Sequence, residues 1–183
     1  MFLRNVAMLV CLGVIFLFSF AQARENVTDW YIKDLRAEFV LASDSTMVVT
    51  EWITADCGQC TGKHGIFRVL PTEARTETDA IKTPVELLEV TDCQGKPYKY
   101  TEIQNSSDST VTWKIGDANT FVTGVHEYKI VYQVKNVVRF GNQAFDEWYW
   151  NINGNFWTMS IDAFSATLIF PDTVRKEDAT LAY

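Results

Sequence analysis

The sequence predicts an all-β domain, an antiparallel β-sandwich of the Ig-like or jelly-roll-like kind with about ten strands. First, β-branched and aromatic residues alternate with polar ones in short runs, which is the period of a strand with one buried face. Second, clusters of turn-forming residues separate the runs, such as "NSSDS" at 105–109 and "GDANT" at 116–120. Many short strands at this spacing are typical of a sandwich or a barrel.

Ten runs fit this pattern, and the polar stretch "PTEARTETDAIKTP" between them is expected to be one helical turn or a long loop. The expected strands are 32–41, 47–55, 65–70, 85–91, 98–104, 110–115, 126–134, 147–152, 156–161 and 166–170.

The N-terminus has the pattern of a secretory signal. Arg4 precedes an apolar run at 6–20, and "AQA" at 21–23 offers the small residues of a cleavage site. A retained membrane anchor is the alternative. We therefore expect a signal peptide at 1–23, an exported domain at 24–171, and a tail at 172–183 that is either the end of the chain or the start of a missing region.

Charge limits the partners. The chain has 16 Lys and Arg against 23 Asp and Glu, a net charge of −7, and no basic stripe. A nucleic-acid partner is therefore not expected, because phosphate backbones require clustered positive charge. Nothing in the sequence calls for a cofactor.

The stretch "FDEWYWNINGNFWTM" at 145–159 is expected to form a tight hairpin. Asn and Gly at 153 and 154 both tolerate the positive φ of a type I′ turn. In this register Trp150 faces Trp157, and one face of the hairpin packs on the core: Trp148, Trp150, Ile152, Trp157, Met159 and Ile161. The other face leaves a strip that can meet a ligand: Glu147, Tyr149, Asn151 and Phe156.

Three motifs occur in an order that resembles a known family: "KHGIFRVLP" at 63–71, "IGDANTFVTGVHEYKIVYQV" at 115–134 and "DEWYWNINGNFW" at 146–157. The family is the extracytoplasmic region of the YciQ-like predicted membrane proteins, domain-of-unknown-function family 2207. The resemblance covers nearly all of 28–171. It implies a β-rich domain outside the membrane, normally followed by transmembrane helices that this sequence lacks, and it carries no catalytic residues.

The cysteines allow three interpretations. Cys57 and Cys60 form a Cys-x-x-Cys, His64 follows, and Cys93 is the remaining cysteine after the signal. An exported chain favours a disulfide, most simply from Cys93 to the 57–60 loop. A zinc site of Cys57, Cys60, His64 and Cys93 has the right number of ligands. A thioredoxin-like site needs a helix after the first cysteine, whereas these residues lie between expected strands.

His64 and Arg68 are the cationic members of "KHGIFR". Together they can hold an anionic group, because the guanidinium of arginine is a two-pronged donor. The structural alternative, which we favour, is that Arg68 pairs with Asp146 or Glu147 and fixes the hairpin to its neighbouring loop.

No complete enzyme motif is present, so the sequence favours a non-catalytic domain. We expect an exported binding or protein-interaction module of a cell-envelope protein, with an envelope protein or a glycan as its partner. One alternative is a carbohydrate-binding module or glycan-active enzyme that uses the strip of Glu147, Tyr149, Asn151 and Phe156. Another is a redox or zinc function at the loop of Cys57 and Cys60.

Overall fold

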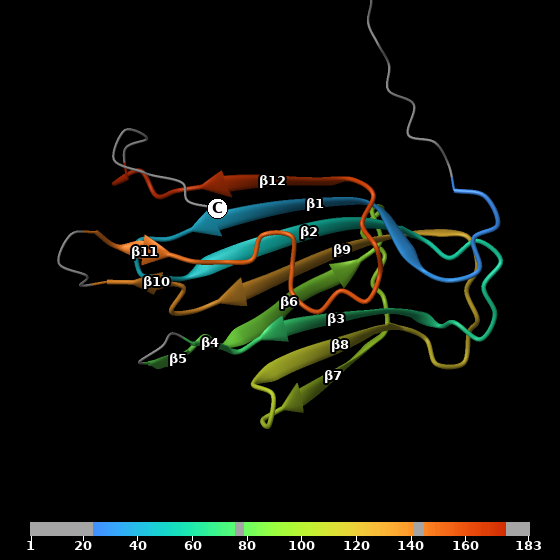
Figure 1. The fold of residues 1–183 in the computed structure, drawn as a ribbon, viewed down its shortest axis with the longest axis horizontal. Helices are drawn as coiled ribbons and strands as arrows, with labels where there is room; N and C mark the ends of the chain where they lie inside the picture. Colours follow the sequence, from blue (N-terminus) through green and yellow to red (C-terminus); the bar gives the residue numbers. More distant parts are fainter. Residues whose placement is uncertain (1–23, 76–78, 141–144, 175–183) are drawn as a thin grey trace, which may run out of the picture.

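The computed structural model describes residues 24–75, 79–140 and 145–174 as an all-β fold with no helix (Figure 1). The predicted signal peptide lies outside the described residues, as does most of the predicted tail. The strands are β1 Tyr31–Leu41, β2 Met47–Asp56, β3 Gly65–Pro71, β4 Glu73–Arg75, β5 Ala80–Lys82, β6 Val85–Thr91, β7 Tyr100–Asn105, β8 Thr110–Gly116, β9 Val125–Val134, β10 Val138–Arg139, β11 Glu147–Trp148 and β12 Phe164–Ile169.

Two larger sheets hold most of these strands. One has five strands in the order β12-β1-β2-β9-β6, and the other has three in the order β3-β8-β7. Two short ribbons, β4-β5 and β10-β11, account for the rest. All pairs are antiparallel except β1 and β12, which run parallel, so the expectation of a wholly antiparallel arrangement is wrong at that edge.

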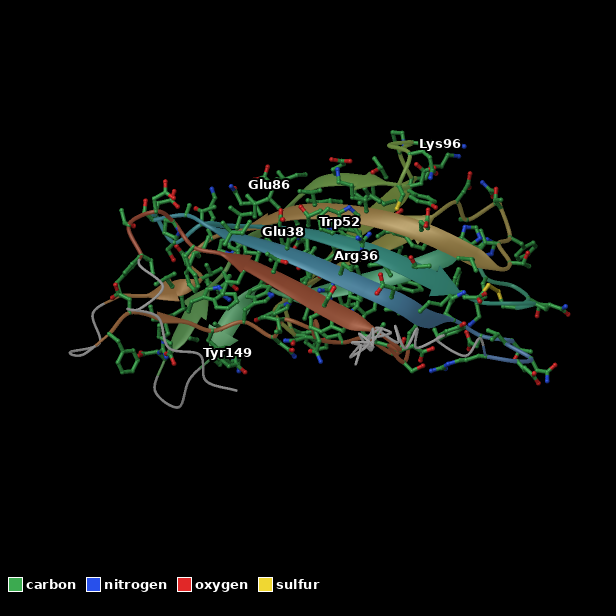
Figure 2. The ribbon with its side chains drawn as sticks, turned by 90° about the horizontal axis from the view of Figure 1, so that it is seen from above. Arg36, Glu38, Trp52, Glu86, Lys96 and Tyr149 are labelled. Atoms are coloured by element: carbon green, nitrogen blue, oxygen red, sulfur yellow. A yellow bond between two sulfur atoms is a disulfide. The ribbon has the colours of Figure 1, made fainter. Side chains whose placement is uncertain are left out.

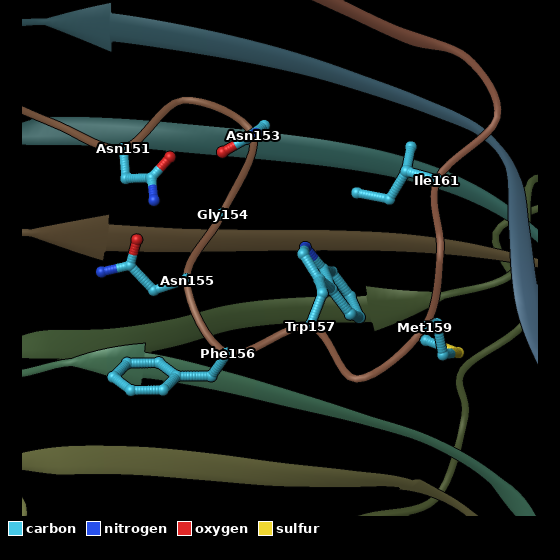
Figure 3. Close-up of a pocket in the computed structure, with 8 residues that line it drawn as sticks. All are labelled: Asn151, Asn153, Gly154, Asn155, Phe156, Trp157, Met159 and Ile161. Atoms are coloured by element: carbon cyan, nitrogen blue, oxygen red, sulfur yellow. The ribbon is translucent and has the colours of Figure 1, made fainter.

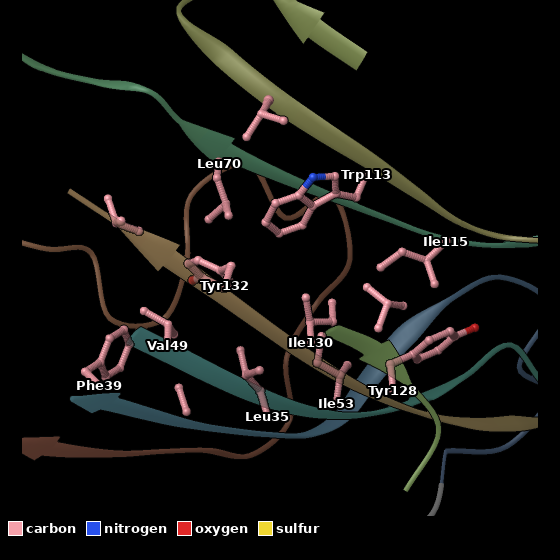
Figure 4. Close-up of a cluster of buried hydrophobic side chains, with 14 of the residues drawn as sticks. Leu35, Phe39, Val49, Ile53, Leu70, Trp113, Ile115, Tyr128, Ile130 and Tyr132 are labelled. Carbon is pink, nitrogen blue, oxygen red and sulfur yellow. The ribbon is translucent and has the colours of Figure 1, made fainter. Parts of the chain in front are cut away.

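Side chains of both sheets meet in one core (Figure 4). In β1 every second residue from Leu35 to Leu41 is buried, which is the alternation that made the strand recognisable. Trp113 of β8 lies against Tyr132 of β9, with ring centroids 5.5 Å apart. The core therefore joins the five-stranded sheet to the three-stranded one.

The expected hairpin at 145–159 is not present. A turn does occur at the Asn-Gly pair, where the Gly154 N–H donates to the Asn151 carbonyl. The flanking residues do not pair with each other, because β11 pairs with β10 instead, through Val138 and Trp148. The expected strand at 156–161 is irregular, and the one at 147–152 shortens to two residues.

We call residues 149–163 the crossing segment, because they run across the two sheets between β11 and β12 (Figure 1). Five of the six side chains expected to face the core do pack against it, and only Ile152 is exposed. The five are Trp148, Trp150, Trp157, Met159 and Ile161. Their apolar surface is buried on the rest of the fold rather than against a partner strand.

The stretch at 71–84, expected to be helical or a loop, contains the ribbon of β4 and β5. Glu73 accepts hydrogen bonds from Arg75 and Lys82, both at 2.6 Å. These ion pairs stabilise the pairing of two short polar strands that have no apolar face.

Candidate functional site

A buried ion pair lies between the two sheets. Arg68 of β3 donates to Glu51 of β2 through Nε (2.8 Å) and Nη2 (2.5 Å), and the side chains are only 1% and 4% exposed. The Tyr132 hydroxyl of β9 donates to the same carboxylate at 3.0 Å. Two parallel N–H···O bonds make this the strong geometry for arginine and a carboxylate. Arg68 therefore pairs with Glu51, and the expected pairing with Asp146 or Glu147 is wrong.

The charges in this cluster depend on each other. Burial acts to lower the pKa of the Arg68 guanidinium, but Glu51 and Tyr132 together outweigh it, so the pKa is raised and the group stays charged. Burial, and then the negative charge of Glu51, raise the pKa of Tyr132 well above its ordinary value. Tyr132 is thus held as a neutral donor at physiological pH.

Arg68 also holds the crossing segment in place. Its Nη1 donates to the carbonyls of Val69 (2.9 Å) and Asn155 (3.3 Å), and its guanidinium lies 4.7 Å from the centroid of the Trp157 ring. A Cβ at Gly154 would lie 2.6 Å from Trp157 Nε1 and 3.0 Å from Arg68 Nη2, so the backbone approaches closely there. These contacts accompany a backbone that is not extended at 155–157, where the positive φ of Phe156 lies outside the range of a strand.

The crossing segment forms a cavity of about 490 Å³ (Figure 3). Its polar lining is amide and uncharged. Phe156 has φ of 64°, a conformation that bulky residues rarely adopt and that costs of order 1–3 kcal/mol. The lining residues are Asn151, Asn153, Gly154, Asn155, Phe156, Trp157, Met159 and Ile161.

The structure brings some of the predicted site residues together. Asn151 and Phe156 line this cavity, and Arg68 lies beneath it in contact with Asn155 and Trp157. Tyr149 does not line the cavity and is 76% exposed. Glu147 sits in β11 and faces Arg139 at 3.4 Å.

His64 is separate from this group. Its Nδ1 lies 2.9 Å from the Thr120 carbonyl, and its ring packs on Phe121 with centroids 4.6 Å apart. Because Arg68 is buried and committed to Glu51, the two residues do not form a shared anion site.

The cysteines adopt a pairing other than the one we expected. Cys57 and Cys60 are joined, with an S–S distance of 2.05 Å, and Cys93 is a free, exposed thiol. The bond from Cys93 to the loop is therefore absent. With two of the four expected zinc ligands joined to each other, the Cys₃His set does not assemble, and residues 24–75, 79–140 and 145–174 contain no cluster of three metal-ligating side chains.

Sequence reasoning missed the partnership of Glu51, Arg68 and Tyr132, although a signal was present. Glu51 occupies an inward position in the alternation of β2, and Arg68 does so in β3, between the buried Ile66 and Leu70. A charged residue in the apolar phase of a strand needs an opposite charge in the same core. Two such residues on different strands predict a pair.

Within the part of the chain that the structure describes, no helix has the length and hydropathy needed to span a membrane. Comparison with known proteins adds three findings. No curated protein matches the chain. A crystal structure described as a "putative protease" from Parabacteroides distasonis is similar to it with a TM-score of 0.35 and 7% identity, over 59% of this chain and 23% of that one. The family described as "Predicted membrane protein (DUF2207) N-terminal domain" matches residues 31–183. The resemblance seen in the sequence is thereby confirmed, and the chain belongs to the DUF2207 family of predicted membrane proteins, of which it contains the N-terminal domain.

Proposed function

We propose that this domain is an exported β-sandwich of a cell-envelope protein and that it binds a protein partner through exposed aromatic side chains. The observation that carries the proposal is their concentration in one stretch of the chain. Five large apolar residues that follow β10, up to position 156 in the crossing segment, are exposed: Phe140, Phe145, Tyr149, Ile152 and Phe156. Four of these residues are aromatic, and aromatic side chains dominate the binding energy at protein interfaces.

The fixed backbone beneath these residues supports the proposal. Arg68 and Trp157 hold the crossing segment at its middle, so Phe156 projects from a position that is already ordered. A partner that contacts it spends little free energy on ordering the chain. The family description, the N-terminal domain of a predicted membrane protein, supports a partner among the proteins of the cell envelope.

Site-specific photo-cross-linking of the protein in its own cells tests this proposal. A photoreactive residue at Tyr149 or Phe156 should give one defined cross-linked partner, and Tyr100, which is 49% exposed on β7, is the matched control. The purified partner should then bind the wild-type protein, and Tyr149→Ala with Phe156→Ala should weaken binding by about 2–4 kcal/mol. Equal cross-linking at all three positions contradicts the proposal.

A carbohydrate ligand is the second candidate, because the cavity of the crossing segment is lined by amides beside an aromatic ring. Asn155 Oδ1 and Trp157 Nε1 are buried there without a hydrogen-bond partner among the described residues. Because both atoms are enclosed, a sugar would first meet the exposed amides of Asn151 and Asn153, which can donate to and accept from its hydroxyls. Glycan-array binding that Asn151→Ala and Phe156→Ala abolish would support this candidate; an array without signal would exclude it.

A further inference from the structure

A second cavity, of about 370 Å³, lies on the outer face of the five-stranded sheet, away from the crossing segment. Figure 2 shows Arg36, Glu38 and Trp52 together on this face, with Tyr149 well separated from them. The remaining lining residues are Ala37 of β1 and Ser165 and Thr167 of β12.

Strand register fixes the arrangement of these side chains. Arg36 pairs with Trp52 on one side and with Ser165 on the other, and Glu38 is beside Thr167. Neighbouring strands are about 4.8 Å apart and alternate residues about 6.6 Å apart, so the group spans roughly 10 Å by 7 Å. That area is comparable with one or two sugar rings. Because β1 has a partner strand on each side, the positions are held by backbone hydrogen bonds rather than by a loop.

Several polar side chains at this cavity are available to form hydrogen bonds with a ligand. The Glu38 carboxylate and the Ser165 and Thr167 hydroxyls have no hydrogen-bond or ion-pair partner within residues 24–75, 79–140 and 145–174. The Arg36 guanidinium lies 5.7 Å from the Trp52 ring centroid and makes a 3.5 Å ion pair with Asp34, in which both side chains are largely exposed. Such an exposed pair contributes little stability and competes weakly with a ligand.

We propose that this cavity binds a neutral saccharide, with Trp52 as the stacking surface and Glu38 as the principal hydrogen-bond acceptor. A carboxylate can accept from two neighbouring hydroxyls, while the guanidinium, the serine and the threonine donate to ring and hydroxyl oxygens. The Arg36 guanidinium stands against two carboxylates, those of Asp34 and Glu38, so the local charge is −1 and an anionic ligand is disfavoured. An added peptide strand does not fit, because the backbone of β1 is already paired with β2 and β12.

The test is titration of the chain with glucose, galactose, mannose and N-acetylglucosamine and with their β-linked disaccharides. Ligand-detected NMR and calorimetry provide the readout, at sugar concentrations up to about 50 mM because single-ring affinities fall near the millimolar range. We expect saturable binding of at least one sugar, lost in Trp52→Ala and weakened about tenfold in Glu38→Gln. Thr54→Ala, on the outer side of β2 but outside the cavity, is the matched control and should leave affinity unchanged.

Three results would overturn the proposal: no saturable binding of any sugar, binding that survives in a folded Trp52→Ala, or binding lost in Asn151→Ala and Phe156→Ala but not in Glu38→Gln. The last result would place the saccharide in the cavity of the crossing segment instead. Circular dichroism shows whether each variant is folded, and if Trp52→Ala is not, Glu38→Gln and Ser165→Ala decide the question. The first two outcomes leave the protein-binding proposal unaffected. Phe156→Ala belongs to both sets of variants, so after the third outcome Tyr149→Ala, which lies outside both cavities, tests protein binding by itself.

Discussion

Replacing Glu51 by Gln should strongly destabilise the fold, because it leaves the Arg68 guanidinium charged and without a counter-ion in the core. The two side chains are 4% and 1% exposed, so water cannot compensate. Breaking a buried pair by removing one partner costs about 3–5 kcal/mol. For a domain of this size that corresponds to a fall in Tm of roughly 6–20 °C.

Urea denaturation followed by circular dichroism measures the loss of stability. A double-mutant cycle of Glu51→Leu and Arg68→Met shows how much of that loss comes from the interaction between the two side chains. The double variant Glu51→Leu with Arg68→Met removes both charges, so it should be more stable than Glu51→Gln alone. It still loses about 1–3 kcal/mol for each group left unpaired, such as the Asn155 carbonyl that Arg68 serves.

The exposed pair of Lys99 and Asp117 is the control. Asp117→Asn should cost less than about 1 kcal/mol, because solvent screens that pair. A loss below about 1 kcal/mol in Glu51→Gln, or a double variant less stable than both Glu51→Leu and Arg68→Met alone, would refute the argument from uncompensated charge.

Two further predictions concern the backbone and the tyrosines. Gly154→Ala should destabilise the protein more than Gly95→Ala in the same denaturation assay. Both glycines have φ near 84°, but only the Cβ at Gly154 would meet Trp157 and Arg68. Equal losses of stability would show that no close contact exists at Gly154. Stability should fall as pH rises above about 10, because burial raises the pKa of Tyr128 and Tyr132 in the folded protein, so the unfolded chain loses those protons first. In Tyr128→Phe, the slope of the unfolding free energy against pH should be shallower by up to about 1.4 kcal/mol per pH unit. An unchanged slope would contradict this assignment.

The sequence predicted well those strands whose side chains alternate between core and solvent. In β1, β2, β8 and β9 the period of two is carried by the residues themselves, so the faces could be assigned without knowledge of the partner strands. The strongly polar β4 and β5 gave no such signal, because ion pairs rather than an apolar face accompany their pairing.

The crossing segment shows where local rules end. The Asn-Gly turn formed as its residues indicate, and the tryptophans did turn inward, but their partners were remote. Arg68 reaches Asn155 from 87 positions away, and no local pattern encodes that contact. The sequence identified Asn151 and Phe156 as candidate ligand-binding residues. The cavity that they line depends on contacts between distant residues, so the sequence did not predict it.

The parallel pairing of β1 with β12 has a consequence for the order of folding. Leu35 pairs with Phe164, 129 positions later (164 − 35). The outer edge of β1 therefore stays unpaired until nearly the whole domain has been synthesised. At about 5–20 residues per second, synthesis alone leaves that edge open for roughly 6–26 s. An open edge is a template for pairing with other chains.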